Sequence, residues 1–124
     1  MNGDILTNFD VSQALNFHIK NNAVATITVR DYEIKVPFGV INTDDINLIS
    51  FTEKPVFSFL INAGLYVLEP KVLRYLNKGE YIDMPVLLEK VKKDDKKIIV
   101  CPIFENWMDI GRFSTLNEAR SLWK

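Results

Sequence analysis

Four short motifs carry the side chains that could do chemistry in this chain. They are Asn2-Gly3-Asp4, Pro37-Phe38-Gly39-Val40, Glu53-Lys54-Pro55 and Trp107-Met108-Asp109-Ile110-Gly111-Arg112. Each motif ends an expected strand or lies in the loop after one, and open α/β sheets place their ligands there. A fifth segment, Asn62-Ala63-Gly64-Leu65-Tyr66, lies between the third and fourth motifs. The motifs thus supply carboxylates and a lysine where an α/β sheet would bind a polar ligand.

Alternating strands and helices are expected to position these motifs. The spacing of apolar residues, together with residues that typically begin or end helices, predicts four helices. They cover residues 11–20, the segment from Pro70 to before Gly79, the segment after Asp83, and about 114–123. In the last helix, Thr115 and Glu118 have the spacing of a capping box. Residues rich in β-branched and apolar types predict strands over 24–30, 38–42, 48–53, 60–68 and 97–103, with a hairpin turn at Thr43–Asp45. The pattern favours a mixed α/β sheet in a single domain over 1–124, without repeats or linkers.

The composition excludes several classes of protein. The 124 residues are 48% hydrophobic and 25% charged with a net charge of −1, as in an ordinary globular domain. No basic block suggests nucleic-acid binding, and no apolar stretch is long enough to span a bilayer. The single cysteine, Cys101, excludes an internal disulfide and favours a cytoplasmic location with a core thiol. His18 is expected to pack rather than to catalyse.

In order and spacing, the five motifs resemble those of the sugar-1-phosphate nucleotidyltransferases, which include glucose-1-phosphate thymidylyltransferases and mannose-1-phosphate guanylyltransferases. The resemblance runs from Asn2 nearly to the C-terminus. It implies the C-terminal half of a Rossmann-like fold, with a mixed, mostly parallel sheet and flanking helices. These enzymes join a nucleoside triphosphate to a sugar 1-phosphate, and they release pyrophosphate.

The resemblance also implies catalytic residues. Asp4 and Asp109 match the family's aspartates that bind Mg²⁺, which prefers one or two carboxylates together with phosphate oxygens and water. Lys54 matches the lysine that contacts the sugar phosphate, and Glu53 would accept hydrogen bonds from sugar hydroxyls. Simpler explanations exist for each: a turn residue for Asp4, pairing with Arg112 for Asp109, and solvent-exposed charges for Glu53 and Lys54.

Four further residues would line the sugar pocket by the same resemblance. The backbone of Gly39 would lie against the sugar, where a side chain would intrude. Asn62 and Gly64 lie where the family's pocket strand passes, although a bulge or close packing explains them equally well. Trp107 would form an apolar wall, or else a core residue. Phe38 departs from the tyrosine common before the glycine, so a hydroxyl contact is lost.

The glycine-rich loop that wraps the triphosphate, and the segment that reads the base, are not found in this sequence. Together with the abrupt start at Met1, this predicts that an upstream segment is missing. We therefore expect little or no transferase activity from the chain alone, which a pyrophosphate-release assay would test. We also expect self-association through surface that the missing half would cover, which light scattering would detect.

Three interpretations remain open from the sequence. The first is a fragment of a nucleotidyltransferase. The second is a non-catalytic module that binds sugar phosphates or has a regulatory role, although such a module would not need both Asp4 and Asp109. The third is a structural α/β domain whose motif matches are coincidental.

Overall fold

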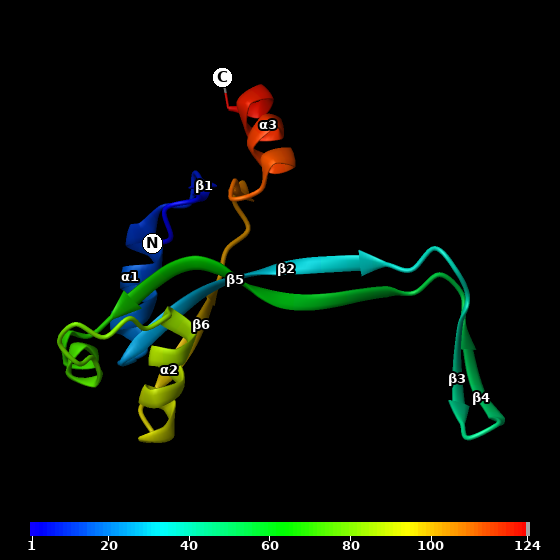
Figure 1. The fold of residues 1–124 in the computed structure, drawn as a ribbon, viewed down its shortest axis with the longest axis horizontal. Helices are drawn as coiled ribbons and strands as arrows, with labels where there is room; N and C mark the ends of the chain where they lie inside the picture. Colours follow the sequence, from blue (N-terminus) through cyan, green and yellow to red (C-terminus); the bar gives the residue numbers. More distant parts are fainter. Residues whose placement is uncertain (124) are drawn as a thin grey trace. The chain divides into compact units, whose positions relative to one another are not determined.

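The computed structural model describes residues 1–123, and these form two compact units. The first unit combines Met1–Arg30 with the chain from Asn62 onward, and the second is Asp31–Ile61. Figure 1 shows the elements of both units along the chain. Within the described residues, no helix has the length and apolar composition that crossing a bilayer requires.

A three-stranded sheet has the strand order β5-β2-β6. Its strands are β2 (Ala25–Lys35), β5 (Val56–Leu68) and β6 (Ile98–Pro102). β2 and β6 are parallel, with Ala25 opposite Ile98 and Val29 opposite Pro102. β2 and β5 point in opposite directions in Figure 1. β-Branched residues are frequent in β2, which suits a strand covered by neighbours on both sides.

The expected mostly parallel sheet is wrong. Among the described residues, the strands form small sheets, and two further strand pairs are antiparallel: β1 (Ile5–Thr7) with β7 (Trp107–Asp109), and β3 (Val40–Asp44) with β4 (Asn47–Thr52). A tight hairpin turn forces its two strands to run antiparallel, whereas a parallel pair needs a longer crossover. The structure is α/β, as expected, but its strand pairing is mostly antiparallel.

The expected helices all form, although their caps differ from the prediction. They are α1 (Val11–Lys20), the 3₁₀ helix η1 (Pro70–Tyr75), α2 (Met84–Lys93) and α3 (Phe113–Leu122). Asp10 caps α1 by accepting a hydrogen bond from Ser12 N at 2.9 Å, and this bond lowers the pKa of the Asp10 carboxyl.

Neither α2 nor α3 has a side-chain cap hydrogen bond. Asp83 occupies the expected N-cap position of α2, but its carboxylate accepts a hydrogen bond from the Tyr81 hydroxyl at 2.9 Å instead of one from the helix. The predicted capping box of Thr115 and Glu118 does not form, because α3 begins one residue earlier and Arg112 occupies the cap position. The Thr115 hydroxyl donates to the carbonyl of Arg112 at 2.9 Å.

Two clusters of buried apolar residues stabilise the first unit. One joins β1, α1, β5 and the end of β6, and contains Ile5, Phe9, Ala14, Ala63, Leu65, Cys101 and Ile103. The other packs η1 and α2 on the start of β2, and contains Val24, Val72, Leu87 and Val91. Cys101 is buried, which confirms the expected core thiol, and burial raises its pKa.

His18 is a buried polar link between α1 and the sheet. Its Nε2 is hydrogen-bonded to the Glu69 carboxylate at 2.9 Å, and its Nδ1 is hydrogen-bonded to the Thr26 hydroxyl at 2.7 Å. Both ring nitrogens therefore have a hydrogen-bond partner. This confirms the expectation that His18 packs.

We expect His18→Ala to lower the free energy of unfolding by about 2–4 kcal/mol, because it leaves a void and removes the partner of the buried Thr26 hydroxyl. Urea denaturation would measure the change. Leu15→Ala is the control on the same helix, since Leu15 is 47% exposed and its truncation should cost less than about 1 kcal/mol. Equal losses for the two variants would contradict the role of His18.

The second unit is built around the β3–β4 hairpin that the sequence predicts. However, the turn is formed by Asp45 and Ile46, because Thr43 and Asp44 belong to β3. Asp45 occupies the turn with a left-handed φ of 50°, which aspartate tolerates better than most residues. Its large apolar side chains are mostly exposed. Those more than half exposed are Tyr32, Phe38, Ile41, Ile46, Leu48, Ile49, Phe51, Phe59 and Leu60.

Candidate active site

The pairing of β1 with β7 brings the first and last motifs together. Ile5 lies opposite Asp109 and Thr7 lies opposite Trp107. The sequence expectation is wrong for both motifs, since each was expected at the end of a strand or in the loop after one. Asn2-Gly3-Asp4 precedes strand β1, and the last motif begins with strand β7. A strand pair holds the two segments in register, which two loops would not do.

The carboxylates of Asp4 and Asp109 face the same small space above Gly111. A Cβ atom on Gly111 would lie 2.9 Å from Asp4 Oδ2 and 3.0 Å from Asp109 Oδ1. The backbone fixes this arrangement, since Ile110 N donates to the Asp4 carbonyl and Gly111 N donates to Asp109 Oδ1, both at 2.8 Å. The structure thus brings together two aspartates from opposite ends of the chain.

The donors at this place suit a small, hard cation. Magnesium in phosphoryl-transfer sites is held by one or two carboxylates, with phosphate oxygens and water completing an octahedron. Two carboxylates around a space that a single methyl group would fill meet that requirement. Within residues 1–123 no group of three or more His, Cys, Asp or Glu side chains is placed to hold a metal ion, so the site offers two carboxylates and not a larger cluster.

Gly111 is a residue of the site that the sequence prediction did not include. It is the point where both carboxylates meet, and any side chain would fill the space between them. The sequence indicates a role for Gly111 only through its position two residues after Asp109. A glycine close to a carboxylate is so common in loops that this position alone does not identify a site residue.

Asn62 and Gly64 hold the segment that carries Asp4. The carbonyl of Gly64 accepts a hydrogen bond from Asn2 N at 2.8 Å, and a Cβ on Gly64 would lie 3.0 Å from Asn2 Nδ2 and from Ile5 Cγ1. Gly64 has a φ of +80°, a conformation that glycine adopts without strain. Asn62 Oδ1 accepts from Gly64 N at 2.8 Å, and its Nδ2 donates to the Tyr66 hydroxyl at 2.6 Å. Both residues thus have a packing role, and sugar contact by either stays a prediction.

Trp107 lines a separate hollow of about 400 Å³, together with Arg30 and residues of the chain before and after β7. The indole Nε1 donates to the carbonyl of Ala63 at 2.7 Å, and the Arg30 guanidinium lies 5.4 Å from the centre of the ring. Asp4 and Asp109 do not line this hollow. Trp107 is therefore both a packing residue and a wall, on the same short strand as Asp109.

Gly39, Glu53 and Lys54 belong to the second unit. The ring of Phe51 lies over Gly39, where a Cβ would come within 2.5 Å of it. Lys54 has a φ of +43°, an uncommon conformation for a residue other than glycine. Glu53 and Lys54 are both exposed at the end of β4.

The family model described as "Nucleotidyl transferase" matches residues 1–123 of this sequence. The chain belongs to this family. More finely, it is a member of the sugar-1-phosphate nucleotidyltransferases, as the motifs predict.

Two relatives illustrate the relationship. Over 118 residues the chain is 31% identical to the UTP–glucose-1-phosphate uridylyltransferase of Synechocystis sp., with 89% of the chain and 30% of the relative covered. It is also 31% identical over 131 residues to the glucose-1-phosphate adenylyltransferase of Clostridium botulinum, with 96% of the chain and 34% of the relative covered. The chain thus spans about a third of the length of these curated relatives.

A solved structure shares the fold of this chain. The crystal structure of HddC from Yersinia pseudotuberculosis superimposes with a TM-score of 0.67 at 20% sequence identity, covering all of this chain and 54% of HddC. The fold is therefore shared with about half of that structure.

Proposed function

We propose that the chain is the sugar-phosphate-binding part of an enzyme that transfers a nucleoside monophosphate from a nucleoside triphosphate to a sugar 1-phosphate. Residues 1–124 would form the C-terminal part of its catalytic domain, and the triphosphate would bind mainly to a preceding part. The observation that carries the proposal is the meeting of Asp4 and Asp109 above Gly111. The pair favours the enzyme over a module that only binds sugar phosphate, which has no need of two converging carboxylates.

The reaction fits this donor set. An oxygen of the sugar phosphate attacks the α-phosphorus of the triphosphate, a new P–O bond forms, and the bond to the β-phosphate breaks to release pyrophosphate. Both reactants are anions, so catalysis depends mainly on positioning and charge neutralisation. A Mg²⁺ ion held by Asp4 and Asp109 would supply part of that neutralisation when bound. The two carboxylates would orient the phosphate groups by fixing the place of this charge.

The backbone of Lys54 supports its proposed contact with the sugar phosphate. A left-handed φ costs a residue with a Cβ about 1–2 kcal/mol relative to glycine. Such strain often occurs where a particular side chain is needed. We propose that the Lys54 ammonium binds the phosphate of the sugar and that Glu53 accepts hydrogen bonds from its hydroxyls. Gly39, Asn62, Gly64 and Trp107 are the further residues proposed to contact the sugar.

The exposed apolar side chains of the second unit support the further proposal that the chain self-associates. Ile46 is 90% exposed and Phe38 is 73% exposed, and the unit has several other large apolar side chains that are more than half exposed. Large exposed apolar surface often marks a site of association with a partner.

Paramagnetic Mn²⁺, used in place of Mg²⁺, tests the carboxylate pair in the chain itself. We expect it to broaden the amide resonances of Asp4, Ile5, Ile110 and Gly111 before all others. Asp4→Asn and Asp109→Asn should each weaken Mn²⁺ binding by at least about tenfold, because each removes one of the two charged ligands. In Asp109→Asn the new amide oxygen can still accept the hydrogen bond from Gly111 N, so the fold should persist.

Asp95→Asn is the matched control, since it removes the same charge from a turn. Asparagine also tolerates the φ of 53° found there. Broadening that begins at other acidic residues, or that survives in both site variants, would overturn the proposal. A second readout is thermal denaturation, in which a sugar 1-phosphate with Mg²⁺ should raise the Tm of the unmodified chain and not of Asp109→Asn.

A further inference from the structure

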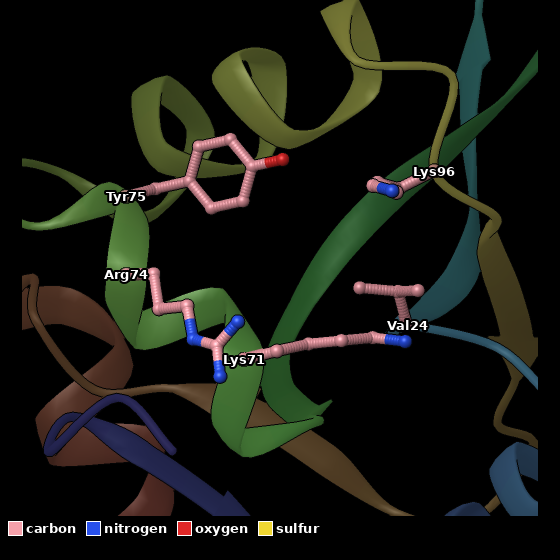
Figure 2. Close-up of a pocket in the computed structure, with 5 residues that line it drawn as sticks. All are labelled: Val24, Lys71, Arg74, Tyr75 and Lys96. Atoms are coloured by element: carbon pink, nitrogen blue, oxygen red, sulfur yellow. The ribbon is translucent and has the colours of Figure 1, made fainter.

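A second hollow lies at the opposite end of the parallel strands. Its volume is about 250 Å³, and it is lined by Val24, Lys71, Arg74, Tyr75 and Lys96 (Figure 2). Val24 comes directly before β2, and Lys96 comes two residues before β6. Because β2 and β6 are parallel, these two residues mark the amino ends of the strands, away from the carboxyl ends where α/β sheets bind their usual ligands. No residue of the candidate active site lines this hollow.

Positive charge dominates the lining. Lys71, Arg74 and Lys96 contribute three cations to five lining residues, although the whole chain carries a net charge of −1. Among the ion pairs within residues 1–123, none involves any of these three side chains. Figure 2 shows Arg74 and Lys71 coming from the same short helix, with the Lys71 side chain extending toward Val24, and Lys96 coming from a separate segment. Uncompensated cations around a hollow favour an anion there.

The remaining walls are apolar. The ring of Tyr75 faces the open space across from Lys96 and Val24 (Figure 2). The Tyr75 hydroxyl donates to Asp94 Oδ2 at 2.6 Å, and this hydrogen bond raises the pKa of Tyr75. The phenol therefore stays neutral at physiological pH. The Asp94 carboxylate is engaged by this hydrogen bond, which holds the ring in place as a wall.

We propose that this hollow binds a small organic phosphate, with the phosphate among Lys71, Arg74 and Lys96 and a short carbon body against Tyr75 and Val24. Arginine and lysine are the usual phosphate-binding side chains, and arginine can donate two parallel hydrogen bonds. The volume of about 250 Å³ corresponds to about eight water molecules at roughly 30 Å³ each in the liquid, which is enough for a phosphate group with a short carbon body. The proposal stands independently of the proposed function.

Titration of the ¹⁵N-labelled chain with phenyl phosphate at low ionic strength tests this site. Phenyl phosphate carries both a dianionic group and a ring. We expect saturable shifts at the amides of Val24, Lys71, Arg74, Tyr75 and Lys96. Phenol should cause no such shifts, and inorganic phosphate should bind at least about tenfold more weakly because it makes no apolar contact.

Two charge-matched double variants decide the location of binding. Lys71→Gln with Arg74→Gln should weaken phenyl phosphate binding by at least about tenfold. Lys78→Gln with Lys92→Gln removes the same charge from exposed positions outside the hollow and should leave affinity within about twofold. Asp4→Asn with Asp109→Asn should also leave it unchanged. Three results would each overturn the proposal. The first is amide shifts that do not saturate and that spread over the whole basic surface. The second is an equal loss of affinity for phenyl phosphate in the Lys71–Arg74 and Lys78–Lys92 double variants, and the third is inorganic phosphate binding as tightly as phenyl phosphate.

Discussion

Gly111→Ala is expected to weaken Mn²⁺ binding to the chain by at least about tenfold while changing its stability by less than about 1 kcal/mol. The new methyl carbon would stand 2.9 Å from Asp4 Oδ2 and 3.0 Å from Asp109 Oδ1, closer than such contacts allow. Both carboxylates must rotate away, and the place that they share is lost. Stability should change little, because the atoms that move are the ends of exposed side chains.

Gly3→Ala is the matched control for this effect. It adds the same methyl group beside Asp4, but nothing lies within 4 Å of the new atom. Mn²⁺ titration followed by amide line broadening measures both variants. If Gly3→Ala and Gly111→Ala lose affinity equally, or if neither does, the geometry above Gly111 is not what binds the ion.

Gly64→Ala is expected to lower the free energy of unfolding by about 2–4 kcal/mol. Two costs combine at this residue. The φ of +80° is strained for any residue with a Cβ, and the added carbon would lie 3.0 Å from both Asn2 Nδ2 and Ile5 Cγ1. Urea denaturation, analysed with an unchanged m-value, measures the loss.

Gly79→Ala separates the two costs. Gly79 has nearly the same φ, +79°, but a methyl group added there would have no atom within 4 Å. Only the backbone cost of about 1–2 kcal/mol should remain. The difference between the two variants then measures how tightly the Asn2–Ile5 segment packs on β5, and equal losses would show that it does not pack there.

The sequence predicted most elements of the fold because their patterns are local. The ten residues of α1 have a helical apolar face and a good capping residue in Asp10, so both ends were predictable. The β3–β4 hairpin was predictable from its turn residues and flanking apolar runs. The 3-residue strands β1 and β7 were missed, because each is too short for a periodic pattern and depends on a partner about a hundred residues away.

The sheet direction was also beyond the reach of local patterns. The alternation of strands and helices predicted only a mixed sheet, and the expectation of mostly parallel strands came from the family resemblance. The candidate site shows the same difference between local and distant information. Asp4 and Asp109 could be proposed from their motifs, whereas Gly111 and the packing role of Gly64 depend on contacts between distant segments.

The β1–β7 pair has a kinetic consequence. The pair has only three residues in each strand, and these lie about a hundred residues apart in the sequence. Forming the pair therefore loses the conformational entropy of a long loop, while few contacts between the two strands compensate for that loss. Such a pair should open in brief local excursions while the larger sheet of β2, β5 and β6 stays intact. A bound cation that bridges the two strands would then make these openings rarer, because it adds a bond that the open pair lacks.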